Sequence, residues 1–144
     1  MTDFSLDPTL AGDCLILGDL PLCRVLLLND SRYPWLVLVP RRAGMAEIID
    51  LDPQDRTRLL DEIVLASEVL KTAAEPDKLN IGALGNKVRQ LHVHVMARFA
   101  SDPAWPGPVW GHSPAVPYPA HVAGIVIDRL RALLTPHGLK AIAP

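Results

Sequence analysis

The chain has 144 residues, of which 49% are apolar and 21% charged, and its formal net charge is −2. This composition is typical of one globular domain that buries a core without disulfides or metals, and we expect a single domain over residues 1–144. Because the charge is small and negative, it gives no electrostatic basis for binding nucleic acid, and we expect no nucleic-acid partner.

The two cysteines, Cys14 and Cys23, form no Cys-x-x-Cys motif, so we expect buried thiols rather than a zinc site or a redox pair. The N-terminus lacks a basic region followed by an apolar run, and no apolar stretch reaches the about 20 residues that span a bilayer. We therefore expect a soluble, cytoplasmic protein that makes no membrane contact.

Apolar patterning predicts a mixed arrangement of strands and helices. Two apolar runs flank the turn formers at 18–21, which indicates a hairpin. Asp52 followed by Pro53 is a typical helix start, and apolar residues then recur about every 3.6 residues as far as Ala74. The predicted elements are strands over 14–17, 22–28, 35–39, 78–83 and 90–98, and helices over 52–74 and about 120–135.

The segment from 101 to 119 contains six of the fourteen prolines together with Trp105 and Trp110. So many prolines exclude a regular element. Disordered segments are poor in aromatic residues, so the tryptophans predict an ordered tail that packs on the protein's own sheet or on a second subunit.

The stretch from Gln90 to Arg98 alternates apolar residues with Gln90, His92 and His94. A period of two places one apolar face and one face with imidazoles on a strand. Two such histidines can attack, donate or accept near neutral pH, which predicts a functional site. The alternatives are a polar sheet face without function, and a metal pair that has no obvious third ligand nearby.

Two further features of the sequence are candidates for a functional role. Arg41 and Arg42 follow the strand that Pro40 ends, where they form a solvated edge or bind phosphate oxygens. Gly82 and Gly85 allow a neighbour or a ligand to approach the backbone closely, although such a pair is also common in simple turns.

The block from Asn80 to Arg98 resembles the active-site block of the histidine triad (HIT) superfamily, whose motif is His-φ-His-φ-His-φ-φ. The segment from Arg24 to Arg42 is similar to the family strand that leads to a Pro-Lys pair, and the helix at 52–74 lies where the family has its main helix. The resemblance covers a core of about residues 14–100.

The resemblance implies an α+β fold with a five-stranded antiparallel sheet, a main helix and a C-terminal helix. It also implies a homodimer that acts as a nucleotide hydrolase or transferase at phosphorus. No cofactor and no structural metal are expected, because the zinc-binding Cys-x-x-Cys of some family branches is absent.

Residue roles follow from the same resemblance. His92 matches the middle histidine, which attacks the α-phosphorus to form a nucleotidyl-histidine, and a backbone carbonyl is expected to hold its other ring nitrogen. His94 matches the third histidine, which contacts the phosphate and the leaving group, and it is the candidate for a positively charged donor. The substrate-binding candidates are Asn86, Lys87, Asn80, Asn29 and Arg41, the register of Asn29 being defined only to about two residues.

Two positions depart from the family pattern. Gln90 occupies the first triad position, and Ala43 stands where many members have a further histidine. The Gln90 amide can still donate and accept hydrogen bonds, so His92 is expected to keep its orientation. Because the amide cannot carry a proton, proton transfer at the site is expected to be weaker.

The leading hypothesis is therefore a hydrolase or transferase that acts at the α-phosphate of a nucleoside derivative, such as a dinucleoside polyphosphate or a nucleoside phosphoramidate. The competing hypotheses are a nucleotide-binding or sensing module with weak or no turnover, and a metal-bound hydrolase centred on His92 and His94.

Overall fold

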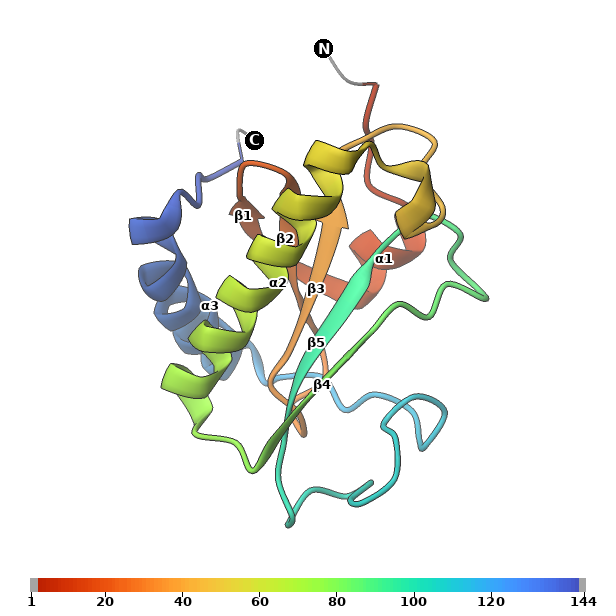
Figure 1. Ribbon diagram of the computed structural model, residues 1–144. Helices are drawn as coiled ribbons and strands as arrows, with labels where there is room; N and C mark the ends of the chain where they lie inside the picture. Colours follow the sequence, from red (N-terminus) through yellow and green to blue (C-terminus); the bar gives the residue numbers. More distant parts are fainter. Residues whose placement is uncertain (1–2, 143–144) are drawn as a thin grey trace.

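The computed structural model describes residues 3–142 and contains one five-stranded antiparallel sheet (Figure 1). The strands lie in the order β1-β2-β3-β5-β4. The predicted fold class, an α+β fold with a five-stranded antiparallel sheet, is confirmed. The strands are β1 (Cys14–Asp19), β2 (Cys23–Leu28), β3 (Trp35–Pro40), β4 (Lys78–Gly82) and β5 (Val93–Arg98).

The main helix α2 (Pro53–Ala74) begins where the sequence predicts it. The Asp52 carboxylate accepts a hydrogen bond from the Asp55 backbone N–H at 2.8 Å, and Pro53 occupies the first turn, where its missing N–H costs nothing. The helix ends at Ala74, and the next residue, Glu75, has a left-handed backbone conformation with φ of 49°.

Helices α2 and α3 (Ala120–Leu134) cover the same face of the sheet (Figure 1). Their apolar side chains share one core with those of the strands. The buried Glu62 carboxylate of α2 also accepts hydrogen bonds from the backbone N–H groups of Leu22 and Cys23, at 2.9 and 2.7 Å. These bonds fasten the helix to the β1–β2 hairpin. The remaining helical segments are α1 (Pro8–Asp13), η1 (Ile48–Asp50) and η2 (Thr135–His137).

A second apolar cluster lies on the opposite face of the sheet, beneath loops rather than beneath long helices. It includes Tyr33, Trp35, Met96 and Val109. Strand β5 contributes to both cores, because Val93 and Val95 face α2 whereas Met96 faces the loops. The predicted alternation of the histidine stretch is therefore present, with His94 among the aromatic residues of the second face.

The start of the histidine strand differs from the prediction, because β5 begins at Val93 and not at Gln90. The last pairing of β3 with β5 joins Leu38 to Val93, and β4 ends opposite His94. With no strand beside residues 90–92, the Leu91 N–H donates to the Met45 carbonyl instead, at 2.9 Å. His92 therefore lies in the segment that leads into the strand.

The proline-rich segment is ordered and packs on its own sheet through the buried Arg98. This guanidinium makes two hydrogen bonds to the Asp102 carboxylate, at 2.8 and 3.0 Å, and one to the Gly107 carbonyl at 2.9 Å. It also lies over the Trp105 ring. The segment is thus held against the strand that carries His94.

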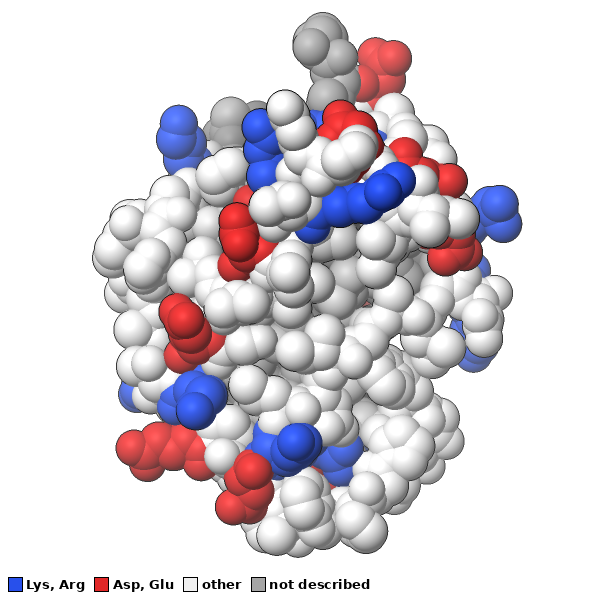
Figure 2. All heavy atoms as spheres, viewed as in Figure 1, with Lys and Arg blue, Asp and Glu red and all other residues white. Residues whose placement is uncertain are grey.

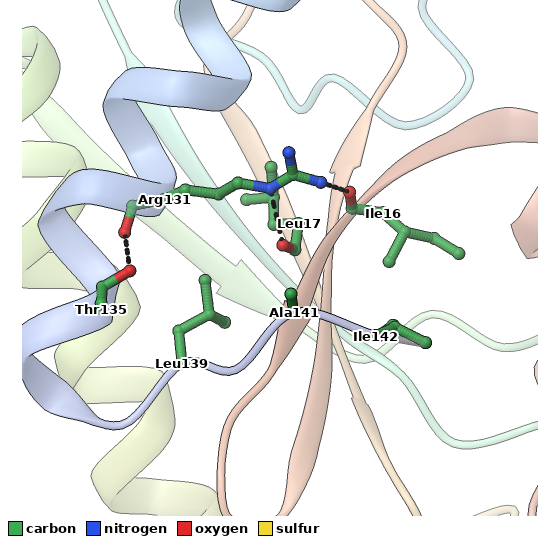
Figure 3. Close-up of a pocket in the computed structure, with 7 residues that line it drawn as sticks. All are labelled: Ile16, Leu17, Arg131, Thr135, Leu139, Ala141 and Ile142. Carbon is green, nitrogen blue, oxygen red and sulfur yellow. Dashed lines mark hydrogen bonds between the residues drawn. The ribbon is translucent and has the colours of Figure 1, made fainter. Parts of the chain in front are cut away.

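The outer edge of the sheet at β1 is protected by a side chain of α3. Arg131 donates hydrogen bonds to the backbone carbonyls of Ile16 and Leu17, at 3.0 and 2.9 Å. All three residues line a cavity of about 440 Å³ (Figure 3). Covering edge carbonyls in this way removes a template for pairing with another chain. The cavity holds neither of the two candidate histidines.

On the face shown in Figure 2, basic and acidic side chains lie close to one another around a largely uncharged middle. Within residues 3–142, none of the helices is both long and apolar enough to cross a membrane.

We expect Asp102→Ala to lower the free energy of unfolding by about 3 to 5 kcal/mol, because it leaves the Arg98 guanidinium buried without a counter-charge. Urea unfolding of both proteins measures this loss. As a matched control, Asp77→Ala removes an exposed carboxylate that binds the Ala100 N–H of the same region, and it should cost about 1 kcal/mol. Equal costs for the two variants would contradict a special role for the buried pair.

Candidate functional site

The two histidines lie side by side, at the end of the sheet where β5 begins. Their ring centroids are 4.9 Å apart with an interplanar angle of 76°, and both residues are buried. His94 is paired with Val37 of β3 on one side and with Gly82 of β4 on the other. The sheet register therefore fixes the position of this pair.

His92 is held by its own backbone neighbourhood. Its Nδ1 lies 2.7 Å from the Gln90 carbonyl oxygen, which can only accept a hydrogen bond. Nδ1 therefore carries the proton and Nε2 keeps a free lone pair. This is the carbonyl contact that the sequence predicts, and His92 also lines a cavity of about 130 Å³.

His94 lies in an aromatic enclosure. The Trp35 indole Nε1–H donates a 2.9 Å hydrogen bond to His94 Nδ1, and the Trp35 and Trp110 rings pack edge-on against the imidazole at centroid distances of 5.5 and 5.4 Å. Burial, and to a lesser degree the neighbouring His92, lower the pKa of His94 to about 4. The expectation of a positively charged His94 is therefore wrong for the free protein, in which His94 is neutral at neutral pH.

Gly82 makes room for the Trp110 ring. A Cβ at Gly82 would lie only 2.9 Å from the Cη2 atom of Trp110, which is too close for any side chain without movement. The neighbour that this glycine admits is thus the protein's own tryptophan, which comes from the proline-rich segment.

The Gln90 side chain binds the N-terminal segment. Its Oε1 accepts a hydrogen bond from the Asp7 N–H, and its Nε2 donates to the Ser5 carbonyl, both at 2.9 Å. Both polar atoms of the amide are therefore occupied, and Gln90 touches His92 through its backbone carbonyl.

Comparison with known proteins places this geometry in a family. The family model described as HIT domain matches residues 11–101. The chain belongs to the HIT domain family. Its members are generally nucleotide-binding hydrolases or transferases.

Three solved structures of bacterial histidine triad proteins resemble this HIT domain over nearly its whole length. The protein from Marinobacter aquaeolei is 45% identical, with a TM-score of 0.91 over 94% of this chain and 98% of its own. The protein from Sinorhizobium meliloti is 48% identical, with a TM-score of 0.89 over 92% and 98%. That from Bradyrhizobium japonicum is 48% identical, with a TM-score of 0.87 over 90% and 96%. The comparison with curated proteins found no match.

Only part of the predicted substrate-binding set lies near the histidines of this HIT domain. Asn86 lines the same cavity as His92 and Gln90, and the exposed Lys87 follows it in the chain. The structure does not bring the other three to this cavity. Asn80 accepts a hydrogen bond from Arg98, Asn29 accepts one from the Tyr118 N–H, and Arg41 donates to the Leu20 and Pro21 carbonyls.

Sequence reasoning missed Arg89 and Trp35, and it placed Trp110 only in a tail that packs on the sheet or on a second subunit. Arg89 lines the cavity beside His92, and Trp35 and Trp110 enclose His94. The position of Arg89 directly before Gln90 was a usable signal for a cation near the predicted phosphate-binding residues. Trp35 lies diagonally across from His94 on the neighbouring strand, a relation that appears only once the register is known.

A metal site at His92 and His94 would need further ligands from other parts of the fold. Across the described part of this HIT domain, no group of three or more His, Cys, Asp and Glu side chains is placed to hold one ion.

The low pKa of His94 predicts a loss of stability in acid. Between the ordinary histidine pKa of 6.5 and about 4, the unfolded chain binds a proton at this position and the folded protein does not. The free energy of unfolding should therefore fall as pH drops through this window, by on the order of 3 kcal/mol from this residue. Urea unfolding at a series of pH values measures the loss.

The control for this prediction is His94→Asn, which retains an acceptor for the Trp35 N–H but does not titrate. Its stability should show a correspondingly smaller decrease between pH 6.5 and 4. Parallel curves for the two proteins would show that His94 titrates normally in the folded state.

Proposed function

We propose that the protein is a cytoplasmic nucleotide hydrolase or transferase that cleaves at the α-phosphate of a nucleoside derivative through a nucleotidyl-histidine at His92. The observation that carries this proposal is the hydrogen bond of His92 Nδ1 to the Gln90 carbonyl. It leaves the Nε2 lone pair available for attack on phosphorus, and His92 lines a cavity of about 130 Å³.

In the first step, the His92 Nε2 lone pair forms a bond to the α-phosphorus, and the bond to the leaving group breaks with its electron pair going to that group. In the second step, a water oxygen bonds to the phosphorus, the P–N bond breaks with its electron pair returning to His92 Nε2, the proton of the water passes to solvent, and the nucleoside monophosphate leaves. Another acceptor in place of water gives transfer. This route divides one difficult displacement into two easier ones.

The charge of the phosphate is met by residues around the same cavity. Arg89 supplies a guanidinium, which matches phosphate oxygens well, and Asn86 supplies amide donors. Lys87 adds a second exposed cation in the adjacent position. These donors stabilise the charge that develops on the phosphoryl oxygens in the transition state. Arg41 has no part in this arrangement, because its guanidinium binds the β1–β2 turn.

The occupied Gln90 side chain favours one of the two substrate classes. An amine leaving group requires a proton as the P–N bond of a phosphoramidate breaks, whereas a phosphate leaving group is stable as an anion. Gln90 carries no titratable proton, and both of its polar atoms bind the N-terminal segment. We therefore favour a dinucleoside polyphosphate over a nucleoside phosphoramidate.

The lack of a titratable proton on Gln90 also supports a second candidate function. This is a nucleotide-binding or sensing module that retains the cavity with weak or no turnover. Calorimetry distinguishes it from the enzyme, because nucleotide would bind whereas product formation would be absent or unchanged in His92→Ala.

We expect incubation with dinucleoside polyphosphates to produce a covalent nucleotidyl adduct, detected as a mass increase of the intact protein. The adduct should be absent from His92→Ala, because the attacking nitrogen is removed, and present in His121→Ala, which removes an exposed histidine of α3 instead. Phosphoramidates should give less adduct. Nucleotide binding without adduct or product from any substrate would refute the enzyme and support the binding module.

We further propose that the protein is a homodimer that pairs through the β4 edge of the sheet. In the described part of the chain, β4 pairs only with β5, so its outer edge is open. Large apolar side chains are exposed on and near this edge, where Ile81 is 50% and Leu84 44% exposed, and Ile48 and Ile49 line a cavity with Ala83.

Ile81→Lys should convert this dimer to a monomer, because it places a charge in the proposed apolar contact. Light scattering after gel filtration measures the mass in solution. Ile125→Lys makes the same change at an exposed isoleucine of α3 and should leave the dimer intact. A wild-type protein that is monomeric at micromolar concentration, or equal effects of the two variants, would contradict this interface.

A further inference from the structure

The hydrogen bond between Trp35 and His94 restricts where the His94 proton can lie. An indole N–H only donates, so the Nδ1 atom that receives it must hold a lone pair. A neutral imidazole has one N–H, and the proton of His94 therefore lies on Nε2. The bond is 2.9 Å long and buried, so no water competes for the indole.

His92 is held in the opposite state by the opposite kind of partner. A carbonyl faces its Nδ1, so His92 carries the proton there and presents a bare Nε2. The two imidazole rings, whose centroids are 4.9 Å apart, thus carry their protons on different nitrogens. One offers a lone pair at Nε2 and the other offers an N–H at Nε2.

We propose that Trp35 is a positioning residue of the histidine pair, whose indole N–H fixes the His94 proton on Nε2 and so makes His94 a neutral hydrogen-bond donor beside the nucleophilic nitrogen of His92. The position of the proton is a property of the free protein. Only its consequence for catalysis, donation to the phosphoryl group or to the leaving group, depends on the proposed function.

No other described neighbour of His94 fixes its proton. Val37 and Gly82, its partners on the two adjacent strands, have no polar side-chain atom. Trp110 contacts the ring edge-on, but its buried Nε1–H has no hydrogen-bond partner within residues 3–142. His92 packs against the ring without a hydrogen bond to it. The single bond from Trp35 therefore selects the tautomer.

Protonation of His94 would place an Nδ1–H against the Trp35 N–H, two donors facing one another. This conflict acts together with burial and the neighbouring His92, which already hold the pKa of His94 at about 4. His92 is the one titratable group that lowers this pKa through its charge. Because His94 is neutral throughout the neutral pH range, its proton stays on Nε2 over that range.

The test is NMR spectroscopy of ¹⁵N-labelled protein, in which long-range proton–nitrogen correlations distinguish protonated from bare ring nitrogens. In the wild-type protein we expect His94 to be protonated on Nε2 and His92 on Nδ1. This measurement needs no substitution and no substrate. A proton on Nδ1 of His94 would overturn the proposal directly.

Trp35→Phe removes the donor while retaining an aromatic ring. We expect the Nδ1–H tautomer of His94 to appear, and its pKa to rise by about one unit, the effect of losing one hydrogen bond that favours the neutral form. Trp110→Phe is the matched control, because it makes the same change at a ring equally close to His94 but without a hydrogen bond. It should leave the tautomer unchanged, and equal effects of the two variants would overturn the proposal.

With a polyphosphate substrate, Trp35→Phe should lower kcat about tenfold with little change in KM, since the donor acts on the reacting group rather than on binding. The two proposals fail differently. If no substrate is turned over but His94 carries its proton on Nε2, the proposed function fails and the tautomer assignment stands. If turnover occurs and the NMR spectrum places the proton on Nδ1, the positioning role fails alone.

Discussion

The buried charge of Arg98 is the constraint on which the histidine site depends. A guanidinium that is 2% exposed must have its hydrogen bonds satisfied inside the protein, because desolvation of an unpaired charge costs several kcal/mol. Its partners are Asp102, Asn80 and the Gly107 carbonyl. Two of these belong to the proline-rich segment, so pairing the charge closes this segment over the sheet and places Trp110 on His94. One ion pair thus links the end of β5 to the enclosure of the catalytic candidate.

The fold was predictable because its signals are local. The alternation in β5 and the cap formed by Asp52 and Pro53 each depend on a few consecutive residues, and both agree with the structure. The start of β5 was not predictable in this way. Gln90 and His92 continue the alternating pattern, but a strand also needs a neighbour, and β3 and β4 offer none beyond Val93 and His94. Pattern determines which face a residue occupies, whereas pairing determines where the strand begins.

The residues of the candidate site also differ in whether a local sequence pattern contains them. Asn86, Gln90 and His92 line one cavity, and a short motif contains all three because they lie within a few residues of one another in the chain. Arg41 and Asn29 were assigned from more distant positions, and both bind backbone groups elsewhere. The tryptophans that enclose His94 come from β3 and from the proline-rich segment. Their contacts follow from register and loop packing, which no local pattern contains.

The Gln90 side chain has a structural role that limits the chemistry it can contribute. The Gln90 amide binds an N–H and a carbonyl of the N-terminal segment at the same time. A neutral imidazole also has one donor and one acceptor, but they lie on opposite edges of the ring. The Gln90 side chain binds Ser5 and Asp7, and the Gln90 backbone carbonyl still accepts the hydrogen bond of His92. His92, the proposed nucleophile, therefore keeps the contact that orients its ring, although the Gln90 side chain cannot exchange protons. In the proposed mechanism such a site favours leaving groups that depart as anions, and the neutral N–H of His94 is a further donor besides Arg89 and Asn86.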